Sequence, residues 1–224
     1  MALFRRRAVD APTDAPAEAE AELTAEGPFD IADVPETGGR LNLGALHIPP
    51  RPGMQLRVEL DKNTKTPISV TCAIGPSSVQ IQLFAAPRSS SLWDDIRPLL
   101  EESARDKNGI VDDVPGVFGR ELLVKLPVTT PGGSGMKSVR FAGIDGPRWM
   151  LRVVFHGEAA LDRDAAEPLE SLIREIVVDR GREARPPREP IPLRLPGQEP
   201  VAEATAAEDA LGVLRRGPEM TETR

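Results

Sequence analysis

Apolar and polar residues alternate along much of the chain between residues 54 and 83. A period of two is typical of strands that bury one face. Turn-like segments, Lys62-Asn63-Thr64-Lys65 and Gly75-Pro76-Ser77, interrupt the alternation. We therefore predict an antiparallel meander with strands at residues 54–60, 67–74 and 79–83. Residues 41–48 are a weaker candidate for an earlier strand.

Two stretches carry apolar residues at helical spacing instead. The first begins at Ser91, which has Asp94 three residues later in the spacing of a capping box, and Asn108-Gly109 ends it. The second covers residues 163–178, where Asp164 and Glu167 repeat the capping spacing. Each helix should turn its apolar residues toward the sheet. They are Leu92, Ile96, Leu99, Leu100 and Ala104 in the first helix, and Ala165, Leu169, Leu172, Ile173 and Ile176 in the second.

A second group of strands lies between the two helices, at residues 119–128, 137–144 and 148–156. Strands followed by a helix, and then strands and a helix again, favour the α+β class. We predict an antiparallel sheet flanked by two main helices. The proline-rich segment 186–196 cannot form a central strand, and we expect it to lie extended on the domain.

Composition divides the chain into three parts. Residues 1–40 contain four basic and nine acidic side chains and residues 197–224 contain three and six, whereas residues 41–196 are almost neutral. The two end segments lack bulky apolar periodicity, so they bury too little surface to offset the entropy of ordering. We predict a disordered acidic tail at 1–40, one domain at 41–196, and a disordered or weakly helical tail at 197–224. An acidic arm that binds a partner is the alternative for the first tail.

The charge pattern also limits the class of partner. The net charge of −7 comes from the end segments, and a neutral centre lacks the basic footprint that a nucleic-acid binder needs. No stretch of eighteen apolar residues occurs, and no apolar segment follows the basic residues 5–7, so we expect neither membrane insertion nor a secretory signal. The single cysteine, Cys72, fits a buried position in a reducing compartment. We expect a cytoplasmic location.

Motifs with catalytic or ligand-binding chemistry do not reach their required spacing. The glycines at 132–135 precede Lys137, but Met136 intervenes and a strand is expected to follow, so we interpret them as a hairpin loop rather than a phosphate site. The two histidines, His47 and His156, lie at element ends and match no triad or metal pattern. We predict no catalytic residue, cofactor or metal.

Arg148 and Trp149 follow the tight turn at residues 145–147 and are the strongest candidates for an interaction surface. Arginine and tryptophan are typical anchors of protein interfaces. The alternative is that Trp149 lies in the core and Arg148 is an ordinary turn charge.

Two further groups of side chains are candidates for binding. Arg88 and Trp93 flank a serine run that enters the first helix, where exposed amides could accept an anion or be capped by the serines. Strand alternation also predicts a polar outward face of the sheet that could bind an acidic partner, or the acidic tail. This face would carry Arg57, Gln80, Gln82, Arg140 and Arg152.

Several segments resemble an actinobacterial family known as domain of unknown function 3710. They are Gly53-Met54-Gln55-Leu56-Arg57, residues 83–89 with Leu92-Trp93-Asp94, residues 143–149, and the proline-rich segment 190–196. Met150 departs from the family pattern, which carries an aromatic residue there. The resemblance implies an actinobacterial cytoplasmic protein and assigns no activity. The order of elements is also similar to the Mog1/PsbP-like α/β/α sandwich, a fold that often serves in binding.

Together these features favour a non-enzymatic adaptor module that binds a protein partner. The alternative is a protein that binds a small or lipid-like molecule in a pocket between sheet and helix. An enzyme of unrecognised type is a third hypothesis.

Overall fold

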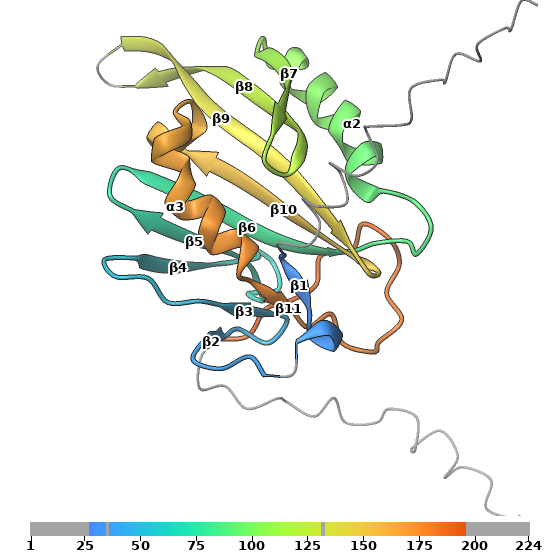
Figure 1. Ribbon diagram of the computed structural model, residues 1–224. Coiled ribbons are helices and arrows are strands. Elements are labelled where there is room, and N and C mark those ends of the chain that lie inside the picture. Colours follow the sequence, from blue (N-terminus) through green and yellow to red (C-terminus); the bar gives the residue numbers. More distant parts are fainter. Residues whose placement is uncertain (1–26, 35, 131–132, 196–224) are drawn as a thin grey trace, which may run out of the picture.

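The large sheet dominates the computed structural model, which describes residues 27–34, 36–130 and 133–195. Its strands run in the order β4-β5-β6-β10-β9-β8-β7, and every neighbouring pair is antiparallel (Figure 1). The strands are β4 (Gln55–Leu60), β5 (Pro67–Ile74), β6 (Ser77–Ala85), β7 (Ile110–Gly116), β8 (Gly119–Thr130), β9 (Gly133–Gly146) and β10 (Trp149–His156).

A second, smaller sheet has the order β1-β11-β3-β2. It consists of β1 (Phe29–Asp30), β2 (Leu41–Asn42), β3 (Leu46–Ile48) and β11 (Val177–Val178), and β1 pairs with β11 in parallel. The structure therefore has one more sheet than the sequence predicts. It also corrects the predicted domain boundary at residue 41, because residues 29 and 30 bond to β11. Residues 1–26 and 197–224, the rest of the two predicted tails, lie outside the described residues.

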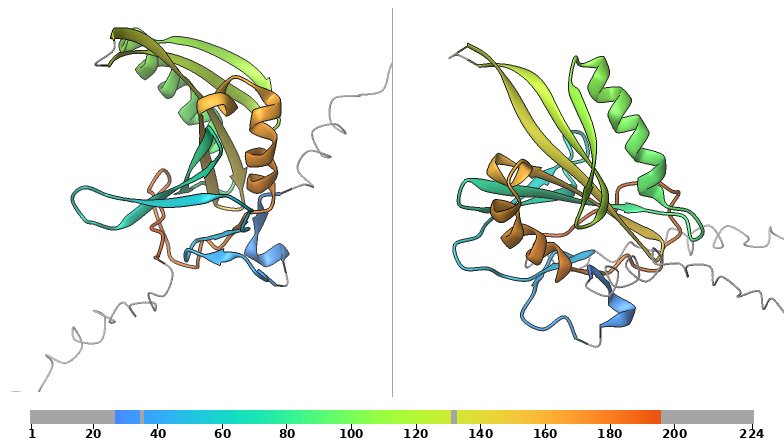
Figure 2. Two further views of the ribbon diagram at one scale, coloured as in Figure 1. Left: turned by 90° about the vertical axis from the view of Figure 1, so that its left-hand side faces the viewer. Right: turned by 45° about the horizontal axis from the view of Figure 1, so that its top comes forward.

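The helices α2 (Leu92–Asp106) and α3 (Arg163–Arg174) lie on opposite faces of the large sheet (Figure 2). On β10, Val153 and Phe155 belong to the same apolar cluster as α3, whereas Val154 packs in the cluster that contains α2. Neighbouring residues of a strand point to opposite faces, so the layers are helix, sheet and helix. The predicted α+β class, with an antiparallel sheet and two main helices, is confirmed.

The larger apolar cluster lies between α3 and the sheet. Leu169, Leu172 and Ile173 of α3 are fully buried there together with Leu151 and Phe155 of β10. Burying a side chain of this size contributes roughly 1.5–3 kcal/mol, so this layer supplies much of the stability. Cys72 lies in the same cluster at 0% exposure, in agreement with its predicted position. Burial raises the pKa of its thiol to about 12.

The helix ends differ in part from the prediction. Ser91 caps α2 as predicted, because its Oγ accepts a hydrogen bond from the Asp94 amide at 3.0 Å. The cap of α3 is Asp162 rather than Asp164, and the helix ends at Arg174 instead of residue 178. The next strand is β11 (Val177–Val178). Its residues were predicted as helix because Ile176 continues the helical spacing of apolar residues. Leu99 is 51% exposed and is not part of the apolar face of α2.

The edge strand β7 is absent from the sequence prediction. It pairs with β8 through residues 110–116, which include Asp112, Asp113 and Pro115. Charged residues and proline are tolerated at a sheet edge, where one side of the strand has no neighbour. These residues interrupt the alternation of apolar and polar positions by which the other strands were predicted.

The proline-rich segment near the C-terminus runs beside the end of β6. The Ile191 amide donates to the Leu83 carbonyl at 2.9 Å, and the Leu193 amide donates to the Pro67 carbonyl at 2.8 Å. Ile191 and Leu193 are each 3% exposed in the larger cluster. The prediction that this segment packs on the domain is confirmed.

Candidate functional site

Trp149 lies in the core, so it cannot serve as the predicted interface anchor. It is 1% exposed, and its Nε1 donates a hydrogen bond to Oδ2 of Asp30 at 2.8 Å. Its ring packs on Gly146, where an added Cβ would lie 2.2 Å from a ring atom. The alternative interpretation of Trp149 is therefore the correct one.

Trp93 is also buried, at 4% exposure, and its Nε1 donates to the Arg120 carbonyl at 2.7 Å. The N-terminus of α2 has no room for an external anion, because the Asp145 carboxylate occupies it. Its oxygens accept hydrogen bonds from the Leu92 amide at 2.9 Å, the Trp93 amide at 3.2 Å and the Ser91 hydroxyl at 2.7 Å. The helix-capping interpretation is therefore correct. The Asp145 carboxylate takes part in the cap, and local spacing could not predict this because Asp145 lies about 50 residues from the helix.

Four of the five residues predicted for the polar face of the sheet lie on the same face. Register places Arg57 opposite Thr71, Thr71 opposite Gln80, and Arg152 opposite Gln82. Arg152 donates to Gln82 Oε1 at 2.5 Å and stacks 5.1 Å from the Phe84 ring centroid, and burial lowers its pKa. Arg152 therefore has its partners within the protein, whereas Arg57 is exposed to solvent.

Arg140 lies on the opposite face, beneath α3, which corrects its predicted position. It faces Phe155 across the β9–β10 pair, and Phe155 is a core residue. Its guanidinium donates to Glu121 at 2.6 Å, to Glu170 at 2.8 Å and to the Ala159 carbonyl at 3.1 Å, and it lies 4.1 Å from the Phe155 ring centroid. The register of β9 against β10 decides this position, and single-strand alternation does not provide it.

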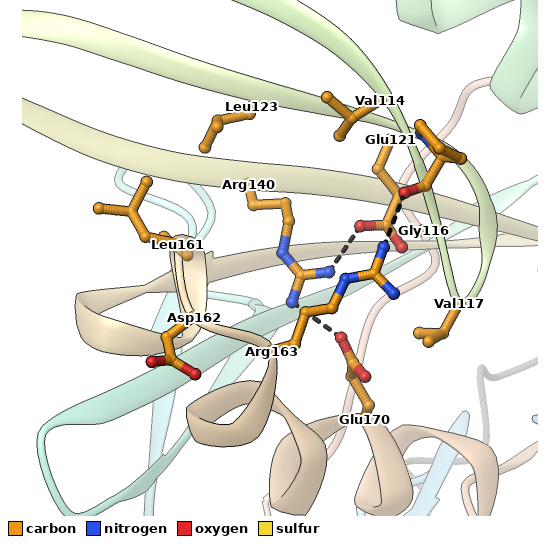
Figure 3. Close-up of a pocket in the computed structure, with 12 residues that line it drawn as sticks. Val114, Gly116, Val117, Glu121, Leu123, Arg140, Leu161, Asp162, Arg163 and Glu170 are labelled. Carbon is orange, nitrogen blue, oxygen red and sulfur yellow. Dashed lines mark hydrogen bonds and ion pairs between the residues drawn. The ribbon is translucent and has the colours of Figure 1, made fainter.

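This ion network forms the floor of a pocket of about 270 Å³ between the sheet and α3 (Figure 3). Glu121 and Glu170 are buried, whereas Leu161, Asp162 and Arg163 are exposed at its rim. The walls are mainly apolar and include Val114, Val117, Leu123 and Ala160. A pocket between sheet and helix was the alternative that the sequence left open, but its residues could not be named because they come from separate segments of the chain.

Glu121 has the most unusual surroundings in the pocket. Burial raises its pKa, and the Arg140 guanidinium opposes this shift without cancelling it. Gly116 makes room for the carboxylate, since an added Cβ would lie 2.0 Å from the carboxyl carbon. The backbone amide of Phe118 donates to the same carboxylate at 3.3 Å. The β7–β8 turn is therefore built around this buried carboxylate.

A group of arginines surrounds the β9–β10 turn, and we call Arg88, Arg148, Arg180 and Arg185 the arginine patch. The Arg148 carbonyl accepts hydrogen bonds from the Ala86 amide and from Arg180 Nε, both at 3.0 Å. These bonds bring three chain segments together. Burial lowers the pKa of Arg180, and the nearby charges of Arg148, Arg185 and Arg88 lower it further.

The members of the arginine patch differ in how they are paired. Arg180 donates to the backbone carbonyls of Gly181 and Glu183, and Arg185 forms ion pairs with Glu183 and Glu189. Arg88 and Arg148 make no side-chain hydrogen bond or ion pair with any residue that the structure describes. Arg88 and Arg148 were predicted as candidates, whereas Arg180 and Arg185 were not, because they lie far away in sequence.

Residues 27–202 match the family described as "Protein of unknown function (DUF3710)". The chain belongs to this family. No curated protein matches. A solved structure of cyanobacterial PsbP (CyanoP) from Synechocystis sp. PCC 6803 matches with a TM-score of 0.33 and 11% identity, covering 60% of this chain and 87% of that one. Values this low carry no conclusion about function.

Two of the segments that resemble the DUF3710 family meet in space. Trp93 packs on Gly143, where an added Cβ would lie 2.3 Å from its ring, and Asp145 binds the backbone of the same helix start. Trp149 packs on Gly146 as described above. The tryptophans and glycines of these segments thus join α2 to β9 and β10, which is a structural role.

Two features are absent from the part of this DUF3710 protein that the structure describes. Within residues 27–34, 36–130 and 133–195, no three His, Cys, Asp or Glu side chains are placed to hold a metal ion together. No helix in the same ranges is long and apolar enough to cross a membrane.

Proposed function

We propose that this DUF3710 protein is a non-enzymatic binding module that recognises an acidic segment of a protein partner through the arginine patch. The observation that carries the proposal is the state of Arg88 and Arg148, which lack any ion pair with described residues although they lie beside further arginines. A cluster of arginines in which two members have no ion-pair partner among the described residues favours the binding of an anion.

The chemistry of the arginine patch favours carboxylates of a protein. A guanidinium offers paired donors that match a carboxylate, and its charge is retained at all physiological pH values. Exposed arginines are frequent hot spots of protein interfaces. The family resemblance also implies an actinobacterial, cytoplasmic protein, and we include both features in the proposal.

Titration of the full chain with a glutamate-rich peptide tests this function, with the matching glutamine-rich peptide as the uncharged control. We expect saturable binding of the acidic peptide that weakens as salt is added, because exposed charges are screened. Arg88→Gln and Arg148→Gln should each weaken binding by about fivefold, or roughly 1 kcal/mol.

Arg57→Gln is the matched control, because Arg57 is exposed like Arg88 and has no partner among the described residues, but lies on the open face of the sheet. Binding that responds to Arg57→Gln and not to Arg148→Gln would place the interaction on that face. Equal affinity for the acidic and the uncharged peptide would exclude the proposed recognition altogether.

A second candidate function is binding of a small ligand, which the pocket between α3 and the sheet favours. Ligand sites are typically concave and mainly apolar with a few polar groups, and this pocket has that composition. A thermal-shift screen with small molecules tests it, because a ligand that binds the native state raises the melting temperature.

A further inference from the structure

The charges in the pocket above Arg140 do not balance. Two carboxylates, Glu121 and Glu170, share the single guanidinium of Arg140 on the floor. At the rim, Arg163 bonds to the Pro115 carbonyl at 3.3 Å, and Asp162 accepts from the amides at the start of α3. With every group in its charged form, the five charged side chains that line the pocket carry one net negative charge.

Glu170 has an unused hydrogen-bond acceptor in this setting. Its side chain is only 8% exposed, and its Oε1 accepts from Arg140 at 2.8 Å. Oε2 accepts no hydrogen bond from any described residue, and it is not among the polar atoms that are sealed from solvent. Figure 3 shows this second oxygen turned away from the bond to Arg140. This carboxylate oxygen is therefore free to accept a hydrogen bond from a donor that enters the pocket.

We propose that the pocket binds a small organic cation, a protonated primary amine whose ammonium group donates to Oε2 of Glu170. This inference rests on the second function proposed above and is independent of the arginine patch. The ammonium would supply the missing positive charge, and the carbon skeleton would lie against Val114, Leu123 and Ala160. The volume of about 270 Å³ is at the lower limit of ligand pockets, roughly 300–1,000 Å³, and limits the ligand to a small molecule.

Other ligand charges fit the pocket less well. An anion would add a third negative charge beside Glu121 and Glu170, and Arg140 already uses its donors on these carboxylates and on the Ala159 carbonyl. A neutral molecule would leave the excess negative charge uncompensated. The partly buried position strengthens this discrimination, because charge interactions are screened less there than in water.

Binding to the full chain tests the inference, measured by calorimetry with putrescine, agmatine and benzylamine as probes. Benzyl alcohol and benzoate, which keep the ring of benzylamine, are the neutral and anionic controls. We expect at least one amine to bind with one-to-one stoichiometry, and benzylamine to bind about tenfold more tightly than either control.

Three variants locate the bound amine. Glu170→Gln keeps the shape of the side chain and should weaken amine binding by about tenfold or more. Glu167→Gln is the matched control, because it makes the same change on an exposed position of α3 and should leave the affinity unchanged. Leu161→Lys adds a positive charge at the rim, where Leu161 is 61% exposed, and should weaken amine binding even if Glu170→Gln does not fold.

The outcomes separate the inference from the function on which it rests. If a control molecule binds the pocket as tightly as benzylamine, or if Glu170→Gln folds and binds amines normally, the ligand class is wrong and the pocket remains a ligand site. If neither the three amines nor the two controls bind at millimolar concentration, both the ligand class and the second function are overturned.

Discussion

The indole Nε1 of Trp149 and Oδ2 of Asp30 form a hydrogen bond of 2.8 Å that joins β10 of the large sheet to β1 of the small one. The other carboxylate oxygen of Asp30 accepts from the Ala32 amide at 3.0 Å and caps the short 3-10 helix Ile31–Asp33. One carboxylate thus fixes the first described segment of the chain to the core, which explains why this acidic segment folds.

Replacing Asp30 should destabilise the domain. Asp30→Ala leaves the buried Nε1 of Trp149 without an acceptor, and we expect the free energy of unfolding to fall by about 1–3 kcal/mol in urea denaturation. Asp33→Ala removes an exposed carboxylate three residues later and should change the free energy of unfolding by less than about 0.5 kcal/mol. Equal effects of the two changes would show that the bond to Trp149 contributes little.

Gly143 should tolerate no side chain. A Cβ at this position would lie 2.3 Å from the Trp93 ring, so Gly143→Ala forces the indole to move and should cost about 1–3 kcal/mol. Gly135→Ala on the same strand has open space around the new methyl group and serves as the control. Unfolding followed by tryptophan fluorescence measures both variants. A stable Gly143→Ala protein with unchanged fluorescence would contradict the packing described here.

His47 should make the protein less stable in acid. Burial lowers its pKa from the usual 6.5, a shift that Asp179 opposes and Arg40 reinforces, and its Nδ1 has no hydrogen-bond partner among the described residues. The unfolded chain therefore takes up a proton more readily than the native one, and the free energy of unfolding falls as the pH drops below about 6.5. Urea denaturation across this range should show a flatter dependence for His47→Gln.

His156 provides the internal comparison for this pH dependence. Burial also lowers the pKa of His156, so part of the acid sensitivity should remain in His47→Gln and disappear only in the double variant. A single His47→Gln change that leaves the whole pH profile as in the wild type would show that His47 keeps its ordinary pKa in the fold.

The acidic residues before β1 should compete with an acidic partner for the arginine patch. Residues 8–26 contain six acidic and no basic side chains, and a tethered segment acts at a high effective concentration. Removal of residues 1–26 should therefore strengthen binding of the glutamate-rich peptide by about threefold or more. The truncation stops before Gly27, since residues 27–34 are part of the fold.

The control for this truncation keeps the length of the chain and changes only its charge. Replacing the six carboxylates of residues 8–26 by amides should have the same effect as removing the segment. Unchanged affinity and salt dependence in both proteins would rule out this competition.

The sequence was sufficient for the elements whose periodicity is regular. The strands around residues 54–60 and 67–74 and the start of α2 at Ser91 follow from local spacing, because each depends on its own residues. β7 was missed because Pro115 and the adjacent aspartates are permitted only at an edge, and edge position is a property of the whole sheet. β1 was missed because its single partner strand lies about 150 residues away.

The candidate site was less predictable than the fold. Which face carries Arg140 depends on the pairing of β9 with β10, and the burial of Trp149 depends on Asp30. The arginine patch combines side chains from three chain segments. These relationships arise only when distant segments meet, and one sequence without relatives contains no direct record of such contacts.

The buried thiol of Cys72 allows opening of the core to be measured by thiol labelling. It is the single cysteine of the chain, it is fully buried in β5, and its pKa of about 12 keeps it in the unreactive thiol form. A thiol reagent should therefore label the native protein only as fast as β5 separates from the helix layer that covers it. The labelling rate would give the kinetic lifetime of the core without any introduced probe.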